Sequence, residues 1–459
     1  MSKAITFYGA AETVTGSRHL LTIDGHHVLV DCGMFQGDRE LQQRNWQPFP
    51  VPPSEVEAVV LTHAHMDHIG WLPRLVKEGF HGPIYCTRAT LGLARISLPD
   101  SGRIQEEDAR RANKHGSVHN PALPLYTEDE VAACLRLFKT VAYDELHPLP
   151  GGAQWRYLPA GHILGSAFAE IYFQDGERIM MSGDLGRFNT PIIRDPASVD
   201  AAEYLVIEST YGDRLHPIED PLIKLEQVLN DAAATRAAVI VPSFSIGRTQ
   251  ELLYYFRQLQ DLGRMPKMPI YLDSPMAVTA TDLYAMAKEE YDDDMKVAVA
   301  TGHSPLDPEG LHTVRDRQQS KAINTATGPM VIVAGSGMAN GGRVVHHLLH
   351  RISDPNTIVL FTGYQAEGTL GRHILDGEPE VRIQGHEVPV RARIEKLNAL
   401  SAHADQGEML HWLRGFKTPP RRTFIVHGEP PAQAALRDKI VAELGWDAVI
   451  PKFGENFEL

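Results

Sequence analysis

The stretch Thr62-His63-Ala64-His65-Met66-Asp67-His68 holds four strong metal-ligand side chains within six residues. It follows the apolar run Ala58-Val59-Val60-Leu61, which is typical of a buried strand. Two histidines at i and i+2 can converge on one metal ion, and the Asp and His just beyond can turn toward a second. Imidazole and carboxylate together favour zinc, with manganese or iron as lesser alternatives. An affinity tag would instead lie at a terminus and would not follow an apolar strand.

Polar side chains of ligand type also recur where other apolar strands end. Asp31 ends the run 27–31, Asp184 closely follows 178–181, and Glu208 follows 204–207. With His63 there are four such positions, which predicts a sheet edge whose loops carry a site. Asp31 is a candidate for bracing that site from behind the ligands, and an ordinary turn residue is the alternative.

Three further histidines lie on loops far along the chain. His162 is flanked by glycines, His403 lies within 401–405, and His427 directly follows the apolar run 423–426. The candidate ligands of one metal ion are three histidines: His63, His65 and His162. The candidates for a second ion are one carboxylate and two histidines: Asp67, His68 and His427. Asp184 is suited to bridge the two ions.

Three protein ligands for each ion, with a shared carboxylate, leave room for a water between the ions. Two ions roughly 3.5–4 Å apart lower the pKa of such a water and stabilise the attacking and leaving oxygens of a phosphoryl displacement. Hydrolysis is therefore expected, with Asp67 and Asp184 taking part in the reaction. Glu208 and His403 lie outside the metal set, and a carboxylate oriented on an imidazole is a standard arrangement for a general acid.

From about residue 235 the pattern changes to strand, Gly-rich turn and helix, repeated four times, with strands expected at 237–241, 269–272, 330–333 and 357–361. This repetition predicts a parallel sheet with crossover helices. Helix N-termini along such an edge favour anions. The candidate phosphate-binding residues are therefore Ser245, Arg248, Ser336, Gly337 and Arg343. Glycines that merely pack helix against strand are the alternative. Residues 100–147 are expected to form a mainly helical covering layer, with a helix start near Thr127.

The bulk properties restrict the class of protein. At 459 residues the chain predicts two or three domains. Three widely spaced cysteines give neither a disulfide framework nor a CxxC zinc pattern, which favours a reducing compartment. With no signal peptide and no membrane-spanning run, a cytoplasmic enzyme without membrane contact is expected. The net charge of −14 argues against a generic nucleic-acid binder but is compatible with a nuclease that uses metal ions and a local basic groove.

Together these motifs resemble the β-CASP branch of RNA-processing nucleases in the metallo-β-lactamase superfamily, over nearly the whole chain. The H-x-H-x-D-H stretch, the loop around His162 and the turn at Asp184 match the superfamily. Glu208, His403 and His427 match three β-CASP motifs, and a histidine at the last of these is typical of RNA-type members.

The resemblance implies an α/β fold: an αββα metallo-β-lactamase sandwich (1–208 and 391–459) with an inserted parallel-sheet β-CASP domain (209–390). It implies two Zn²⁺, with Mn²⁺ as an alternative, and cleavage of single-stranded RNA by a hydroxide held between the metals. His403 would protonate the leaving oxygen, and the ends would be 5′-phosphate and 3′-hydroxyl. Internal cutting is expected, with 5′-exonuclease activity and a homodimer as open options. No additional C-terminal dimerisation domain or N-terminal KH module is evident.

Three alternative functions are considered. A DNA nuclease would use the same chemistry. A thioesterase or lactonase of the superfamily would keep the metal residues but would not need the inserted sheet, Glu208 or His403. A scaffold subunit that has lost its ligands is disfavoured, because all seven ligand positions are filled.

Overall fold

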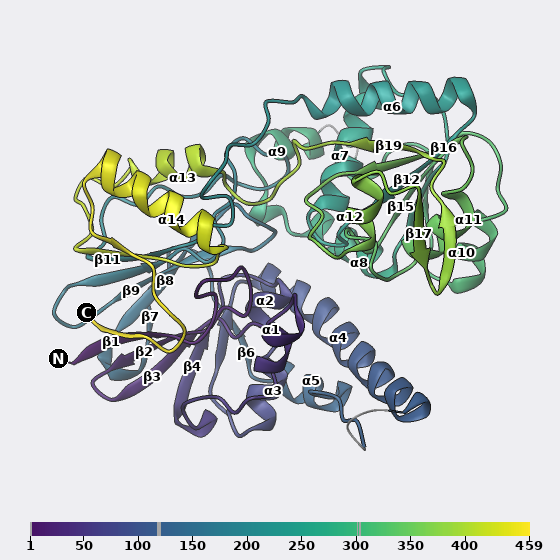
Figure 1. The fold of residues 1–459 in the computed structure, drawn as a ribbon. Helices are drawn as coiled ribbons and strands as arrows, with labels where there is room; N and C mark the ends of the chain where they lie inside the picture. The colour runs from purple at the N-terminus through teal and green to yellow at the C-terminus, as the bar shows by residue number, and fades with distance from the viewer. Residues whose placement is uncertain (1, 117–120, 301, 303) are drawn as a thin grey trace. The chain divides into compact units, whose positions relative to one another are not determined.

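The structure, a computed structural model, describes all residues except 1, 117–120, 301 and 303. The chain forms two compact units (Figure 1). The first comprises Met1–Asn189, Asp195–Leu215 and His403–Leu459, and the second comprises Thr190–Arg194 and His216–Ala402. The second unit is thus inserted into the first. The domain boundaries at 208/209 and 390/391 remain a prediction.

The first unit contains two seven-stranded sheets. In spatial order, one sheet consists of β22 (Asn456–Glu458), β1 (Lys3–Phe7), β2 (His19–Ile23), β3 (His26–Val30), β4 (Val56–Val60), β5 (Ile84–Cys86) and β6 (Phe138–Thr140). The other consists of β21 (Ala448–Val449), β20 (Arg422–Ile425), β11 (Tyr204–Ile207), β10 (Arg178–Met181), β9 (Ala167–Tyr172), β8 (Gln154–Pro159) and β7 (His147–Pro148).

One apolar core joins the inner faces of these sheets. Val28 and Val60 of the first sheet share it with Trp155 and Val206 of the second. On the outer face of the second sheet, Met180 packs in a separate core with the last helices, α13 (Gln406–Leu413) and α14 (Pro430–Lys439). The outer side of the first sheet carries α1 (Arg39–Arg44), α2 (Met66–Ile69), α3 (Leu72–Lys77), α4 (Arg88–His115) and α5 (Glu128–Leu135) (Figure 1). This is the expected αββα sandwich.

The second unit is built on a six-stranded sheet whose strands pair in parallel throughout. Its spatial order is β14 (Leu311–Thr313), β13 (Ile270–Asp273), β15 (Met330–Ala334), β12 (Ala238–Pro242), β16 (Thr357–Phe361) and β19 (Arg393–Lys396). The helix α6 (Pro221–Thr235) precedes the first of these strands along the chain. The crossover helices are α7 (Arg248–Asp261), α8 (Pro275–Met286), α9 (Asp293–Ala300), α10 (Arg317–Ile323), α11 (Val344–Arg351) and α12 (Leu370–Leu375). A two-stranded ribbon, β17 (Glu380–Ile383) and β18 (His386–Pro389), completes it.

Alternate residues of β12 explain why this sheet is apolar on both faces. Val239 and Val241 belong to the core under α6, α7 and α8, whereas Ile240 belongs to the core under α11 and α12. A parallel sheet covered by helices on both faces requires such continuous apolar runs. The predicted parallel sheet with crossover helices is confirmed.

The predicted helical layer is partly wrong. The helix α4 begins earlier, at Arg88, and α5 begins at Glu128 with Thr127 as its N-cap, close to the predicted start. Residues 136–147 are not helical, and they include the edge strand β6, which pairs in parallel with β5. Residues 117–120 lie outside the described residues. Across the described part of the chain, no helix combines the length and apolar character needed to cross a bilayer.

Candidate metal centre

The candidate site lies where several strands of the first unit end. The strands β3 and β4 pair in parallel, as do β10, β11 and β20. Parallel strands bring their carboxyl ends to one edge, where the loops that follow them meet. Asp31 follows β3, His63 follows β4, Glu208 follows β11 and His427 closely follows β20. The short helix α2 then places Asp67 and His68 in its first turn.

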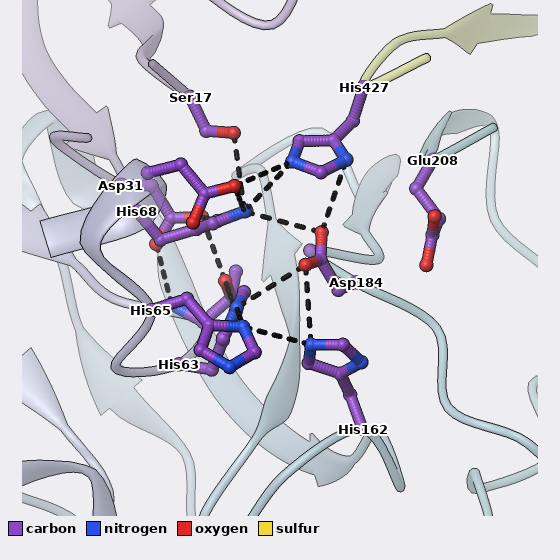
Figure 2. A network of polar contacts seen from close by, with 12 residues as sticks. Ser17, Asp31, His63, His65, His68, His162, Asp184, Glu208 and His427 are labelled. Atoms are coloured by element: carbon purple, nitrogen blue, oxygen red, sulfur yellow. Dashed lines mark hydrogen bonds and ion pairs between the residues drawn. The ribbon is translucent and has the colours of Figure 1, made fainter. Parts of the chain in front are cut away.

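Three histidines and one carboxylate form the first group (Figure 2). His65 Nδ1 lies 3.1 Å from Nε2 of His63 and 3.1 Å from Nε2 of His162. Asp184 Oδ2 lies 3.3 Å from His63 Nε2 and 3.4 Å from His162 Nε2. The ligand atoms of all four residues fall within 4.8 Å of one another. A single cation among them would be within reach of three imidazoles and a carboxylate.

Asp67, His68 and His427 form the second group. His427 Nε2 lies 3.3 Å from Asp67 Oδ2 and 3.3 Å from His68 Nε2. The other oxygen of Asp184, Oδ1, lies 3.2 Å from His68 Nε2. The two oxygens of Asp184 therefore face different groups, which is the geometry of a carboxylate between two cations (Figure 2).

Asp184 also provides a test of whether a metal fits. Both of its carboxylate oxygens are buried, and neither accepts a hydrogen bond from the residues that the structure describes. An ionised carboxylate without hydrogen bonds is costly to bury, whereas metal coordination satisfies its lone pairs. The donor set of imidazole nitrogens and carboxylate oxygens suits a divalent transition metal such as zinc.

Burial keeps the histidines of the first group neutral, as metal binding requires. Burial, followed by repulsion from His68, lowers the pKa of His63 to about 3. Burial also lowers the pKa of His65 to about 4 and that of His162 well below its ordinary value. Each of these rings therefore keeps a lone pair for a cation at neutral pH.

His68 is oriented by a carboxylate behind it. Burial lowers the pKa of His68, but Asp184 and Asp31 outweigh it, so that the net pKa lies well above 6.5. Asp31 Oδ2 lies 2.8 Å from His68 Nδ1, which leaves Nε2 directed to the centre. Asp31 also accepts hydrogen bonds from the backbone N–H and the hydroxyl of Thr62, both at 2.7 Å. Asp31 therefore contacts the candidate ligand His68 from the side away from the centre, and its bracing role stays a prediction.

Glu208 and His403 form a pair beside the centre. His403 Nδ1 lies 3.0 Å from Glu208 Oε1, and Glu208 is completely buried. The N–H groups of Leu185 and Thr210 donate to the Glu208 carboxylate and fix its orientation. Burial lowers the pKa of His403, but the carboxylate of Glu208 outweighs it and raises the pKa to about 9. The Glu208 carboxylate thus favours the cationic form of His403, whose Nδ1 lies 3.9 Å from Asp184 Oδ2.

The five candidate phosphate-binding residues lie in the second unit, between the neighbouring strands β12 and β15 and the first residues of the helices that follow them. Ser245 Oγ lies 3.1 Å from Ser274 Oγ, and Ser336 Oγ is 3.5 Å from the carbonyl of Gly341. Arg248 forms an ion pair with Glu251, and Gly337 packs against the ring of Phe244. Arg343 donates to Asp273 at 2.6 Å and to two backbone carbonyls, which anchors its guanidinium to the sheet. Phosphate binding remains a prediction for all five.

Sequence reasoning missed the hydroxyl groups that hold the candidate ligands. Thr62 links Asp31 to the start of the histidine stretch, and Thr210 Oγ1 lies 3.2 Å from His427 Nδ1. Ser17 Oγ lies 3.4 Å from His68 Nε2 (Figure 2). Thr62 and Thr210 adjoin residues that the sequence did single out, and that adjacency is the only signal that could have identified them.

Family models match the chain in three consecutive segments. The metallo-beta-lactamase superfamily matches residues 16–243, the Beta-Casp domain matches 249–374, and the Zn-dependent metallo-hydrolase RNA specificity domain matches 387–451. The chain belongs to the β-CASP family of RNA-processing nucleases within the metallo-β-lactamase superfamily. It is accordingly a metal-dependent hydrolase.

Several relatives match almost the whole chain. Ribonuclease TTHA0252 of Thermus thermophilus is 40% identical over 451 residues, which cover 98% of both chains. Transcription termination factor FttA is 30% identical in Methanocaldococcus jannaschii, over 93% of this chain and 67% of that protein. The homologous FttA of Methanosarcina mazei is 28% identical, over 96% and 69%. A crystal structure of a protein of unknown function from Enterococcus faecalis shares the fold, with a TM-score of 0.56, 12% identity and complete coverage of both chains.

Proposed function

We propose that this protein is a zinc-dependent ribonuclease that hydrolyses single-stranded RNA at a two-metal centre and leaves 5′-phosphate and 3′-hydroxyl ends. The observation that carries the proposal is the position of Asp184, with one oxygen facing each ligand group. The first ion would be held by His63, His65 and His162, and the second by Asp67, His68 and His427. The name of the Thermus relative, a ribonuclease, supports RNA as the substrate.

Bound zinc ions would supply a Lewis acid for the phosphate and an acidified water as nucleophile. The remaining roles belong to the chain itself. Asp184 and Asp67 would help to hold the ions and would orient the nucleophilic water. Asp31 holds the ring of His68 in place through its Nδ1.

His403 is the proposed general acid for the leaving 3′ oxygen. An alkoxide is a poor leaving group, and protonation as the bond breaks is worth about 10²–10⁴-fold in rate. Glu208 keeps His403 protonated and oriented, at 3.0 Å from its Nδ1. A thioesterase or lactonase has no comparable need for this pair, which favours phosphodiester hydrolysis.

End-labelled RNA and a matched DNA oligonucleotide would test the reaction and its substrate together. Wild-type protein should cut RNA, a chelator should abolish cutting, and His403→Ala should slow it on the order of 10²–10⁴-fold. Products should carry 5′-phosphate, and the label pattern should separate internal cutting from 5′ trimming. Intact RNA alongside hydrolysis of a thioester or lactone would refute the proposal, and equal cutting of DNA would remove the RNA preference alone.

The metal, the assembly and the location are part of the same proposal. Metal analysis of the purified protein should find two zinc ions per chain, with manganese as the alternative. Light scattering would test the proposed homodimer. A cytoplasmic location is supported by three buried cysteines that form no disulfide, and cell fractionation would test it.

A further inference from the structure

We propose that Phe244 and Tyr364 form a platform on which bases of single-stranded RNA stack. The two residues belong to the second unit, whereas all the candidate metal ligands belong to the first. Phe244 is 44% exposed and Tyr364 is 51% exposed. An aromatic ring exposed to this degree offers a face on which a flat ligand group can stack. The identification of RNA as the occupant rests on the proposed function.

The fold brings the two residues to the same sheet edge. Phe244 follows β12 and Tyr364 follows β16, and these strands are direct neighbours that pair in parallel from Ala238 opposite Thr357. Both loops therefore leave the sheet at its carboxyl edge, where ligands bind in sheets of this kind. The pairing predicts that the two rings flank one surface.

A buried glycine connects the two loops. A Cβ atom on Gly337 would lie only 2.6 Å from Cδ2 of Phe244, so the ring rests directly on the backbone there. The carbonyl of Gly337 accepts a hydrogen bond from Nε2 of Gln365 at 3.1 Å. The same amide group lies 3.1 Å from the carbonyl of Tyr364 and 3.2 Å from that of Gly363. Gln365 thus ties the loop that bears Tyr364 to the loop that supports Phe244.

The platform is held in place before any ligand arrives. Thr249 Oγ1 donates to the carbonyl of Phe244 at 2.7 Å, and Gln250 Nε2 donates to that of Ser245 at 3.2 Å. These bonds fix the backbone that carries the Phe244 ring, so the loop need not become ordered when a base stacks there. Loss of a large exposed ring therefore affects binding more than folding.

The charges around the platform favour bases over phosphates as the groups it recognises. The Arg248 guanidinium lies near Gly363 and pairs with Glu251, and its side chain is only 9% exposed. Glu367, three residues after Tyr364, is exposed. These three charges sum to −1, so attraction has to come from the ring faces. Every base presents a π face, and stacking on an aromatic side chain therefore tolerates any sequence.

RNA binding by the full-length chain tests this proposal. All proteins would carry His403→Ala so that the RNA stays intact, and affinity would be measured by fluorescence anisotropy. Phe244→Leu and Tyr364→Leu keep apolar volume but remove the ring, and each should raise Kd about tenfold. Phe244→Trp and Tyr364→Phe should restore binding. Trp46→Leu is the matched control, because Trp46 is also 51% exposed and lies in the first unit.

Two further measurements separate stacking from other causes. An abasic oligonucleotide of equal length and charge should bind wild type and leucine variants alike, and the salt dependence of RNA affinity should be the same in all of them. A 2-aminopurine base should be quenched by the parent protein and less by the leucine variants. Unchanged Kd for both leucine variants, or an equal loss on the abasic chain, would overturn the proposal. Altered self-association with unchanged RNA affinity would assign the surface to a second copy instead. These experiments measure RNA binding alone. A failure of the wild-type protein to cleave RNA would appear only in the cleavage assay, so the two proposals can fail independently.

Discussion

At the scale of single residues, the centre depends on one carboxylate that faces two groups. Asp184 has both oxygens buried without hydrogen bonds from the described residues, and its neighbours are ring nitrogens at 3.2–3.4 Å. Replacing it with Asn keeps the shape but removes the charge that offsets two cations. A substitution of Asp184 is therefore the most direct test of the two-metal proposal.

Asp184→Asn should lose at least one metal ion per chain and reduce RNA cleavage on the order of 10³-fold or more, because both ions lose a ligand. Metal content by mass spectrometry and initial rates would measure this. Glu208→Gln is the matched variant, since it should retain both ions and lose rate alone. If Asp184→Asn kept its full metal content, the bridging role would be wrong.

Asp31→Asn should weaken metal affinity or activity about 10–100-fold, the usual effect of removing a carboxylate that orients a metal-binding histidine. The physical reason is the 2.8 Å contact with His68 Nδ1, which directs Nε2 to the centre. Competition with a zinc-sensitive dye would give the affinity. Asp24→Asn, at an exposed hairpin turn, should behave as wild type. Equal metal affinity in both variants would reduce Asp31 to a turn residue.

At the scale of elements, features that depend on residues close together in the sequence were predicted well, and features that depend on distant residues were missed. The ligands at His63–His68 are local, and strand ends at Asp184, Glu208 and His427 are visible as polar residues after apolar runs. The strand β6 was missed because Phe138–Thr140 owes its conformation to pairing with β5, more than fifty residues earlier. Thr62 and Thr210 were missed because a hydroxyl that contacts a distant residue leaves no periodic pattern.

The second unit contains a buried polar network that should make its stability depend on pH. Asp273 accepts hydrogen bonds from Ser320 at 2.6 Å and Arg343 at 2.6 Å, and its Oδ2 lies 2.7 Å from His347 Nε2. Burial raises the pKa of Asp273, but its hydrogen-bonding partners, His347 first, lower that pKa by more than burial raises it. The net pKa of Asp273 therefore lies below 3.8. The folded pKa is lower than the unfolded one, so this stabilisation is present above about pH 4 and is lost as the pH falls through the folded pKa.

Asp273→Asn should lower the free energy of unfolding of the second unit by about 3 kcal/mol at pH 7, because Arg343 loses its buried anionic partner. Its stability should also fall less than that of wild type between about pH 5 and pH 3. Calorimetry across this range would measure both effects. Asp282→Asn, an exposed partner of Arg315, should change stability by less than about 0.5 kcal/mol. Parallel pH curves for wild type and Asp273→Asn would contradict the assignment.

At the scale of the whole molecule, all seven proposed ligands belong to the first unit, although they are spread from His63 to His427. Metal binding would therefore join the last part of the chain to the first. A ligand that binds only the folded state stabilises it by about 2.7 kcal/mol at a hundred times its Kd. The second unit contributes none of the proposed ligands, so it gains no stability from the metals directly.

Chelation should thus lower the melting temperature of the first unit and leave that of the second nearly unchanged. The shift should be about 5–10 °C, given the linkage energy of about 2.7 kcal/mol and a unit of this size. Calorimetry of the full chain, with and without chelator, would resolve the two transitions, and Asp273→Asn would identify the second by shifting it selectively. Added zinc should restore the first transition in wild type but not in Asp184→Asn. An equal shift of both transitions would mean that the units unfold together, and no shift in either would mean that the centre does not hold metal in the folded protein.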